Sequence, residues 1–355
     1  MKKILIAFSV LGILAWSCSK DDSTKKNNFD RAGLITNMAN NAVLPSLDEL
    51  STEAENFFTA AETFKANANN SNLDLLKNQW KNLATSWQNS KFFMVKDLKY
   101  SGQEQEIAYW PAHTSKIDGL LSSSSQINVD FIKGLGANQK GLFALEYVLF
   151  NQDFNTISGN SQAIDFIVST AQNINLGVNE LKSVWTNAYQ PKFIASTDNF
   201  VTSTIPTLTN RMIEYAEWVK NTKIGYPLAL SKYTTINDAK LESIYAKYSV
   251  ELIEQNITTL KSVYQGYNAS AIGFDDYLLS FGTKGIELDK KIQNQFLVLE
   301  NLLSTLPKPA FNNLTNKKTD YTEFHTEVKT LIKLLKTEFI ILLEVTPTFS
   351  DADGD

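Results

Sequence analysis

One segment of the chain places an ionisable group where ligand binding or acid–base chemistry is possible. Glu146 is the only charged residue in the run GLFALEYVLF at positions 141–150. A helix of this composition would be apolar nearly all round and therefore buried, and a buried carboxylate needs a partner or a proton. Two interpretations stay open. Glu146 is either a ligand or acid–base group, or it makes a structural hydrogen bond to a neighbouring helix or loop.

Most other catalytic patterns are missing from the sequence. It contains no GxSxG elbow, Walker loop, dinucleotide fingerprint, HExxH zinc motif or CxxCH haem motif. The two histidines are His113, in an irregular stretch, and His325, in a helical stretch rich in charge. His113 and Asp118 are the further ligand candidates, although a loop hydrogen bond is the commoner role for such a histidine. We expect His325 to be exposed.

The N-terminus has the layout of an export signal. Two lysines at positions 2–3 precede an apolar run at 4–16, and Ser17-Cys18 follows. The run is too short to cross a hydrocarbon core, which takes about 20 helical residues. Cys18 is the only cysteine, so the chain cannot form an internal disulfide, and residues 14–18 resemble a lipobox. We therefore predict a signal peptide at 1–17 and a membrane anchor through a lipid on Cys18.

The residues after Cys18 predict a tether. The stretch SKDDSTKKNN at 19–28 has no apolar side chain, so residues 18–29 are expected to form a lipidated flexible linker. Its lysine followed by acidic residues resembles the export signal of surface lipoproteins in the Bacteroidetes group. We expect an outer membrane lipoprotein, displayed on the cell surface or on the periplasmic face.

The composition fits a sizeable helical protein. The formal net charge is −5 without basic clusters, which argues against nucleic acid as a partner. Hydrophobic residues make up 43% of the chain, and Gly and Pro are too scarce for a turn-rich all-β fold. Apolar residues recur at steps of three and four, as in Leu73, Leu76, Trp80, Leu83 and Trp87.

This periodicity predicts long helices near 45–67, 162–189, 200–221 and 283–303, with an irregular region of short helices and loop at 97–140. We expect an all-α fold of two antiparallel helical bundles, 30–205 and 206–355, since single apolar stripes must be buried on one another. A faint echo between the segments that start at Gly141 and Gly273, each with a tyrosine beyond, suggests an internal duplication.

At the Glu146 segment the sequence resembles the imelysin family, also described as insulin-cleaving membrane proteases and imelysin-like iron-regulated proteins. The family signature is Gly-x-His-x-x-Glu, and here it is read as Gly141, Phe143 and Glu146. Further similar pieces follow in order: Trp80 and Trp87, the segments WP at 110–111 and ID at 117–118, GYPL at 225–228, ES at 242–243, YS at 248–249, and the tail TPTFSDADGD at 346–355. The resemblance implies a two-bundle helical fold and an envelope role tied to iron or haem uptake.

The chain departs from this signature where a metal would bind. Phe143 occupies the histidine position, and a phenyl ring cannot act as a ligand in place of imidazole. Ala84 and Lys91 stand where many relatives have arginine and glutamate. A metal-activated water needs about three protein ligands, and the degenerate motif does not supply them. The sequence therefore leaves the cofactor open, with iron or another divalent metal as the candidate.

Three functions follow from these observations. The first is a non-enzymatic binding lipoprotein, with an iron-related ligand or an envelope protein as its partner besides the membrane. The second is a metallopeptidase-like enzyme with a rebuilt site, in which His113 or Asp118 replaces lost ligands. The third is a purely structural or adhesive surface protein. The loss of the histidine favours binding over catalysis.

Overall fold

The computed structural model describes residues 28–230, 234–267 and 271–348. Cys18, the predicted signal peptide, most of the predicted linker and the acidic end at 351–355 lie outside these residues, so their predicted roles are not tested by the fold. Within the described part the chain forms helices and contains no β-strand. The predicted all-α fold is confirmed.

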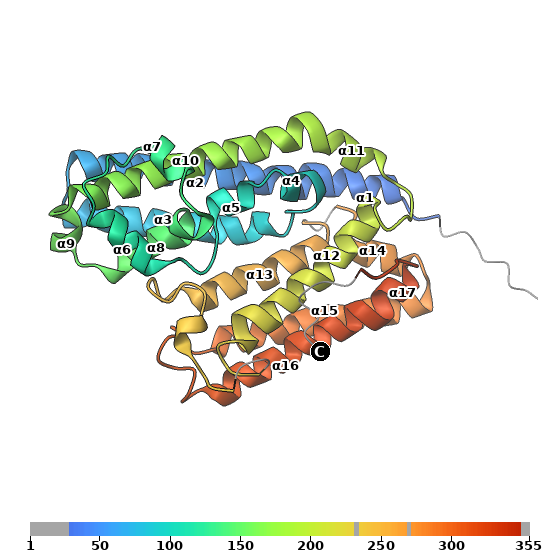
Figure 1. Ribbon diagram of the computed structural model, residues 1–355. Helices are drawn as coiled ribbons and strands as arrows, with labels where there is room; N and C mark the ends of the chain where they lie inside the picture. Colours follow the sequence, from blue (N-terminus) through green and yellow to red (C-terminus); the bar gives the residue numbers. More distant parts are fainter. Residues whose placement is uncertain (1–27, 231–233, 268–270, 349–355) are drawn as a thin grey trace, which may run out of the picture.

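The N-terminal half is built on three long helices that lie side by side, α2, α3 and α10 (Figure 1). Shorter helices connect and flank them. Their bounds are α1 Arg31–Asn37, η1 Met38–Val43, α2 Leu44–Ala66, α3 Asn70–Lys91, α4 Lys96–Tyr100, α5 Gln103–Ile107, α6 Thr114–Leu121, α7 Val129–Lys133, η2 Ala137–Gln139, α8 Leu142–Asn151, α9 Phe154–Ser158, α10 Ser161–Val184, η3 Trp185–Tyr189 and α11 Gln190–Ala195.

The C-terminal half forms a second layer below the first in Figure 1. α12 and α16 pack together, as do α13 and α15, and α13 also faces α3 across the boundary between the halves. The bounds are α12 Thr204–Trp218, η4 Val219–Gly225, η5 Asp238–Lys240, α13 Ser249–Tyr264, α14 Phe274–Leu279, α15 Thr283–Thr305, α16 Lys318–Leu334, η6 Leu335–Phe339 and α17 Ile340–Leu342.

Local sequence explains where the long helices begin. The side chain of Asn69 accepts a hydrogen bond from Asn72 N–H at the start of α3, and Asn160 accepts two at the start of α10. Such caps satisfy amide donors that have no partner inside the helix. The predicted apolar stripes face inward, and Trp80 and Trp87 of α3 are fully buried. Burial of these stripes, rather than helix propensity alone, supplies most of the stability.

The predicted long helices near 45–67, 162–189, 200–221 and 283–303 correspond to α2, to α10 with η3, to α12 with the start of η4, and to α15. The irregular region at 97–140 holds four short α-helices and one 3-10 turn. No helix among the described residues is both long and apolar enough to cross a membrane. The boundary at 205–206 falls in the first turn of α12, and it stays a prediction, as does the internal duplication.

Candidate functional site

Helix α8 carries the signature and is buried along nearly its whole length, from Leu142 to Leu149. Gly141 precedes it with φ +80°, and a Cβ at this position would lie 2.7 Å from the carbonyl oxygen of Ile107. Only glycine tolerates both this backbone conformation and this approach. Trp80 Nε1 of α3 donates a hydrogen bond of 2.9 Å to Leu142 O, which fixes the first turn of α8 against α3.

Glu146 connects the two halves of the protein. Its carboxylate is 2% exposed, and Oε1 accepts hydrogen bonds of 2.9 Å from the backbone N–H groups of Tyr245 and Ala246. These amides belong to residues 242–246, which lie between η5 and α13 and which we call the clasp loop. A carboxylate of the first bundle therefore holds a loop of the second.

Burial raises the pKa of Glu146 from 4.5 to about 7, because it disfavours the charged form. The two backbone amides act in the opposite direction, and the negative charge of Glu242 adds to the rise. The Ser243 hydroxyl oxygen is buried without hydrogen-bond geometry to any described group, and its residue has φ +61°. On balance the surroundings of Glu146 raise its pKa, because the effect of burial exceeds that of the hydrogen bonds to the charged form.

Asp118 reaches the clasp loop through two tyrosines. Tyr147 OH donates a hydrogen bond of 2.7 Å to Asp118 Oδ1, and the Tyr147 ring packs edge-on against Tyr245 with centroids 5.1 Å apart. Burial and the nearby Asp118 carboxylate raise the pKa of Tyr147 to about 12, so its hydroxyl remains a donor. Asp118 is therefore linked to the same loop as Glu146, through the contact between Tyr147 and Tyr245.

The other sequence candidates lie differently. His113 is exposed, and its Nδ1 lies 3.3 Å from Ser115 Oγ. The imidazole therefore makes a local hydrogen bond to a residue two positions further along the chain. Phe143 is 2% exposed and fills the position of the signature histidine with an apolar ring. The expectation that His325 is exposed is wrong. It is partly buried beside Gly225, where α16 packs against η4. This burial, together with the positive charge of nearby lysines, lowers the pKa of His325 to about 4.

A buried polar network beside the clasp loop was not predicted. Lys223 Nζ lies 2.6 Å from Glu242 Oε2, and both side chains are at most 5% exposed. The same ammonium donates to Asn256 Oδ1 at 2.5 Å and to Gln88 Oε1 at 3.1 Å. Asn256 Nδ2 and Gln88 O both contact Tyr215 OH, at 2.6 and 2.5 Å. The network joins α3, α12, η4, the clasp loop and α13.

The π-helical turns of η4 bring Lys223 into this network, since wide turns rotate side chains away from their α-helical register. Burial lowers the pKa of Lys223 to about 8, while Glu242 acts to raise it. Its Nζ also lies 4.4 Å from the Trp218 ring centroid, and Lys91 Nζ lies 4.1 Å from the same centroid. Lys91, which the sequence resemblance aligned with a family glutamate, is here a cation–π partner of Trp218.

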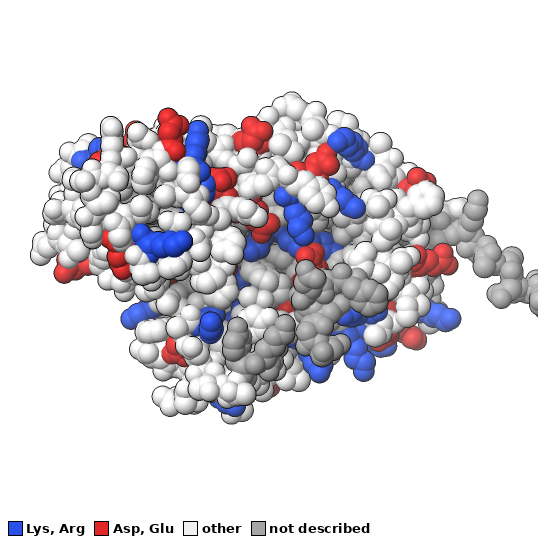
Figure 2. All heavy atoms as spheres, in the orientation of Figure 1, with Lys and Arg blue, Asp and Glu red and all other residues white. Residues whose placement is uncertain are grey.

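Charged side chains also gather on the surface near this interface. Figure 2 shows basic and acidic groups in the middle of the face, between the two layers of Figure 1. Lys91 Nζ lies 3.7 Å from Glu104, and Arg211 pairs with Glu214 at 2.9 Å. Arg211 also donates to the carbonyl oxygens of Lys91 and Phe92 at the end of α3. At the rim, the contacts that cross the interface are therefore these Arg211 hydrogen bonds and the approach of Lys91 to the Trp218 ring, while each ion pair lies within one half.

The residues around Glu146 do not fit a metal centre. Among the described residues no group of three or more His, Cys, Asp or Glu side chains is placed to hold an ion. Glu146 Oε1 already accepts two amide hydrogen bonds, and the neighbouring carboxylate of Glu242 is paired with Lys223. What this arrangement does is to connect the two halves: Glu146 of α8 accepts hydrogen bonds from the clasp loop, and Gln88 of α3 accepts one from Lys223, beside the Lys223–Glu242 ion pair.

Fold and site define the class: an all-α protein of two layers whose halves are joined at a buried carboxylate of helix α8. The imelysin family model matches residues 43–337, and the chain belongs to that family, as the sequence resemblance predicted. No curated protein matches the chain.

Two solved structures share the fold. An imelysin-like protein from Psychrobacter arcticum 273-4 is 17% identical with a TM-score of 0.75, over 90% of this chain and 97% of that one. A protein from Parabacteroides distasonis ATCC 8503, described as an iron-regulated protein A precursor, is 16% identical with a TM-score of 0.71, over 87% of this chain and 95% of that one.

Proposed function

We propose that this chain is an exported imelysin-family lipoprotein that acts by binding at the cell envelope, in an iron-related role, rather than by hydrolysis. One observation carries the proposal. The carboxylate of Glu146 is turned to the backbone of the clasp loop, while Phe143 takes the place of the only imidazole in the signature. A hydrolytic metal site needs about three ligands and an open position for water, and this arrangement supplies neither.

The iron-related part of the proposal draws on similarity. The structural neighbour from Parabacteroides distasonis is described as an iron-regulated protein A precursor, which supports both an iron link and export. The N-terminal pattern supports a lipid on Cys18 and a position at the outer membrane, on the cell surface or the periplasmic face. A haem or iron ligand, or an envelope protein, would be the partner.

Calorimetry on the purified chain from Ser19 onward tests the iron-related role. Ferrous iron, ferric iron, zinc and haem are titrated separately, and metal content is measured on the protein as purified. We expect saturable, stoichiometric binding of an iron species or of haem. If none of these ligands binds, the iron-related role is removed and binding to an envelope protein remains.

Cleavage of an unfolded protein substrate tests the competing enzymatic function. We expect no cleavage, with or without a chelator. Chelator-sensitive cleavage that disappears in Glu146→Gln would establish a metallopeptidase and overturn the proposal. Anchoring is tested separately by mass spectrometry and detergent partitioning of the full chain against Cys18→Ala, in which the lipid should be lost.

A further inference from the structure

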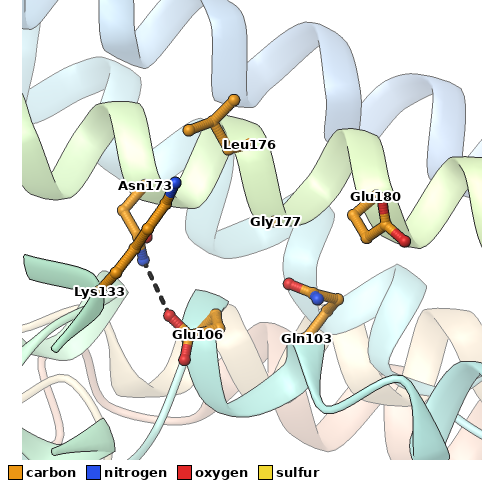
Figure 3. A pocket seen from close by; sticks show the side chains of 7 residues that line it. All are labelled: Gln103, Glu106, Lys133, Asn173, Leu176, Gly177 and Glu180. Carbon is orange, nitrogen blue, oxygen red and sulfur yellow. Dashed lines mark hydrogen bonds between the residues drawn. The ribbon is translucent and has the colours of Figure 1, made fainter. Parts of the chain in front are cut away.

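A polar pocket lies in the first bundle, away from the clasp loop. It has a volume of about 340 Å³ and opens between α5, α7 and α10. Such a volume is at the small end of ligand sites, which span roughly 300–1,000 Å³. Figure 3 shows Lys133 at one end, Glu180 at the other, and the polar side chains of Gln103, Glu106 and Asn173 between them. The pocket thus presents a cation and an anion at opposite ends.

On the inner wall of this pocket, the Glu106 carboxylate is already paired with protein groups. Lys140, whose side chain is 2% exposed, contacts both carboxylate oxygens of Glu106 at 2.7 Å and donates to the carbonyl oxygen of Lys133 at 3.0 Å. Asn173 Nδ2, on a residue that is 3% exposed, donates to Glu106 Oε2 at 3.1 Å (Figure 3). The negative charge of Glu106 is therefore balanced by the buried Lys140 ammonium, and its carboxylate is held in place by Lys140 and Asn173.

Lys133 and Glu180, the charged groups at the two ends, are accessible to a ligand. Among the described residues, Lys133 Nζ has one ion-pair contact, a long one of 4.0 Å to Asp130 on its own helix, and its side chain is 51% exposed. Glu180 is exposed and takes part in no ion pair among the described residues. Exposed charges without a close partner are available to a ligand at little desolvation cost.

Gly177 gives the pocket its floor. A Cβ at this position would lie 3.1 Å from Gln103 Oε1 and 3.5 Å from Ile107 Cγ1, so a side chain here would crowd the end of Gln103. The side-chain amide of Gln103 makes no hydrogen bond to another described group, and it faces the same space (Figure 3). The middle of the pocket therefore offers an amide donor and acceptor between the two charges.

We propose that this pocket binds a small zwitterion of dipeptide size, with its ammonium group at Glu180 and its carboxylate at Lys133. Gln103 and Asn173 would contact the polar groups between them. A bare divalent cation fits less well, because Lys140 neutralises Glu106 and Lys133 faces the same cavity. The site is separate from the clasp loop, and the proposal does not depend on an iron-related role.

Calorimetry with the chain from Ser19 onward tests this site. The probes are dipeptides, beginning with glycylglycine, followed by the N-acetylated and C-amidated forms of the tightest binder. We expect at least one zwitterion to bind saturably. Glu180→Gln and Lys133→Met should each weaken it roughly tenfold, as loss of one charge-assisted contact does. Asp165→Asn is the matched control, since it removes a carboxylate from α10 that pairs with Lys65 outside the pocket.

The modified probes report which end of the ligand each residue contacts. Acetylation removes the ammonium group, so the acetylated probe should bind the parent and Glu180→Gln equally. Amidation removes the carboxylate, so the amide should bind the parent and Lys133→Met equally. The proposal is overturned if no zwitterion binds, if the variants weaken every probe alike, or if Asp165→Asn weakens binding as much as Glu180→Gln.

Discussion

Replacing Glu146 by glutamine should change how the stability of the protein depends on pH. Its pKa is raised from 4.5 to about 7 in the folded chain, chiefly by burial. Between these two values the unfolded chain releases the proton of this group while the folded chain retains it. Folding therefore favours the protonated form, and the stability contributed by this group is lost as pH rises from about 4.5 to 7.

The size of the effect follows from the same rise in pKa. A change from 4.5 to about 7 corresponds to about 3 kcal/mol of free energy between the protonated and ionised forms. Glutamine has the shape of the protonated acid, its carbonyl oxygen can accept from Tyr245 and Ala246, and it does not ionise. Relative to the parent, Glu146→Gln should therefore gain up to about 3 kcal/mol in free energy of unfolding between pH 4 and pH 8.

Urea denaturation at several pH values between 4 and 8 measures this difference. Other shifted groups, such as Asp275 with a pKa raised to about 6, titrate in both proteins and cancel when the curves are subtracted. Glu323→Gln serves as the control, because this carboxylate is exposed and its removal should leave a flat difference. A flat difference for Glu146→Gln as well would show that the carboxylate ionises normally, and the argument for its desolvation would fail.

Three further predictions concern the same region. Lys223→Met should lower the free energy of unfolding by about 3–5 kcal/mol, because it leaves the Glu242 carboxylate buried without its ion-pair partner. In the same denaturation measurements, adding Glu242→Gln to this variant should recover part of the loss. Gly141→Ala should lower the melting temperature and cost at least about 1–3 kcal/mol, because its Cβ would meet Ile107 O. Phe143→His, which restores the signature, should not bind metal stoichiometrically in elemental analysis, because one added imidazole does not complete a set of about three ligands.

The long helices could be predicted because their apolar stripes repeat with a helical period over many turns. The same periodicity could not reveal the π-helical turns of η4, which follow α12 without a break. A lysine at position 223 is expected to be exposed, since isolated lysines are rarely buried. Only its partners, Glu242 and Asn256, explain its burial, and they come from segments further along the chain.

The Glu146 site shows where sequence reasoning ends. The run around it predicts burial, and burial is confirmed. The choice between a ligand and a structural hydrogen bond depended on partners that lie 99 and 100 positions away, in a loop without a periodic pattern. Tyr245 and Ala246 contribute through their backbone amides, so no feature of their side chains could have indicated the contact.

The contacts of Glu146 also explain how the glutamate of the signature can persist in a chain that lacks its histidine. Phe143 fills its position with an apolar ring that is 2% exposed, whereas Glu146 accepts hydrogen bonds from two part-buried amides of the clasp loop, which would lose this partner without it. On the other side of the loop, Glu242 is held by Lys223. Because both contacts secure one loop between the bundles, losing the histidine removes a potential ligand and leaves this connection intact. Losing the glutamate would leave the clasp-loop amides without this hydrogen-bond acceptor, which costs free energy of folding. The two signature positions are therefore under different physical constraints.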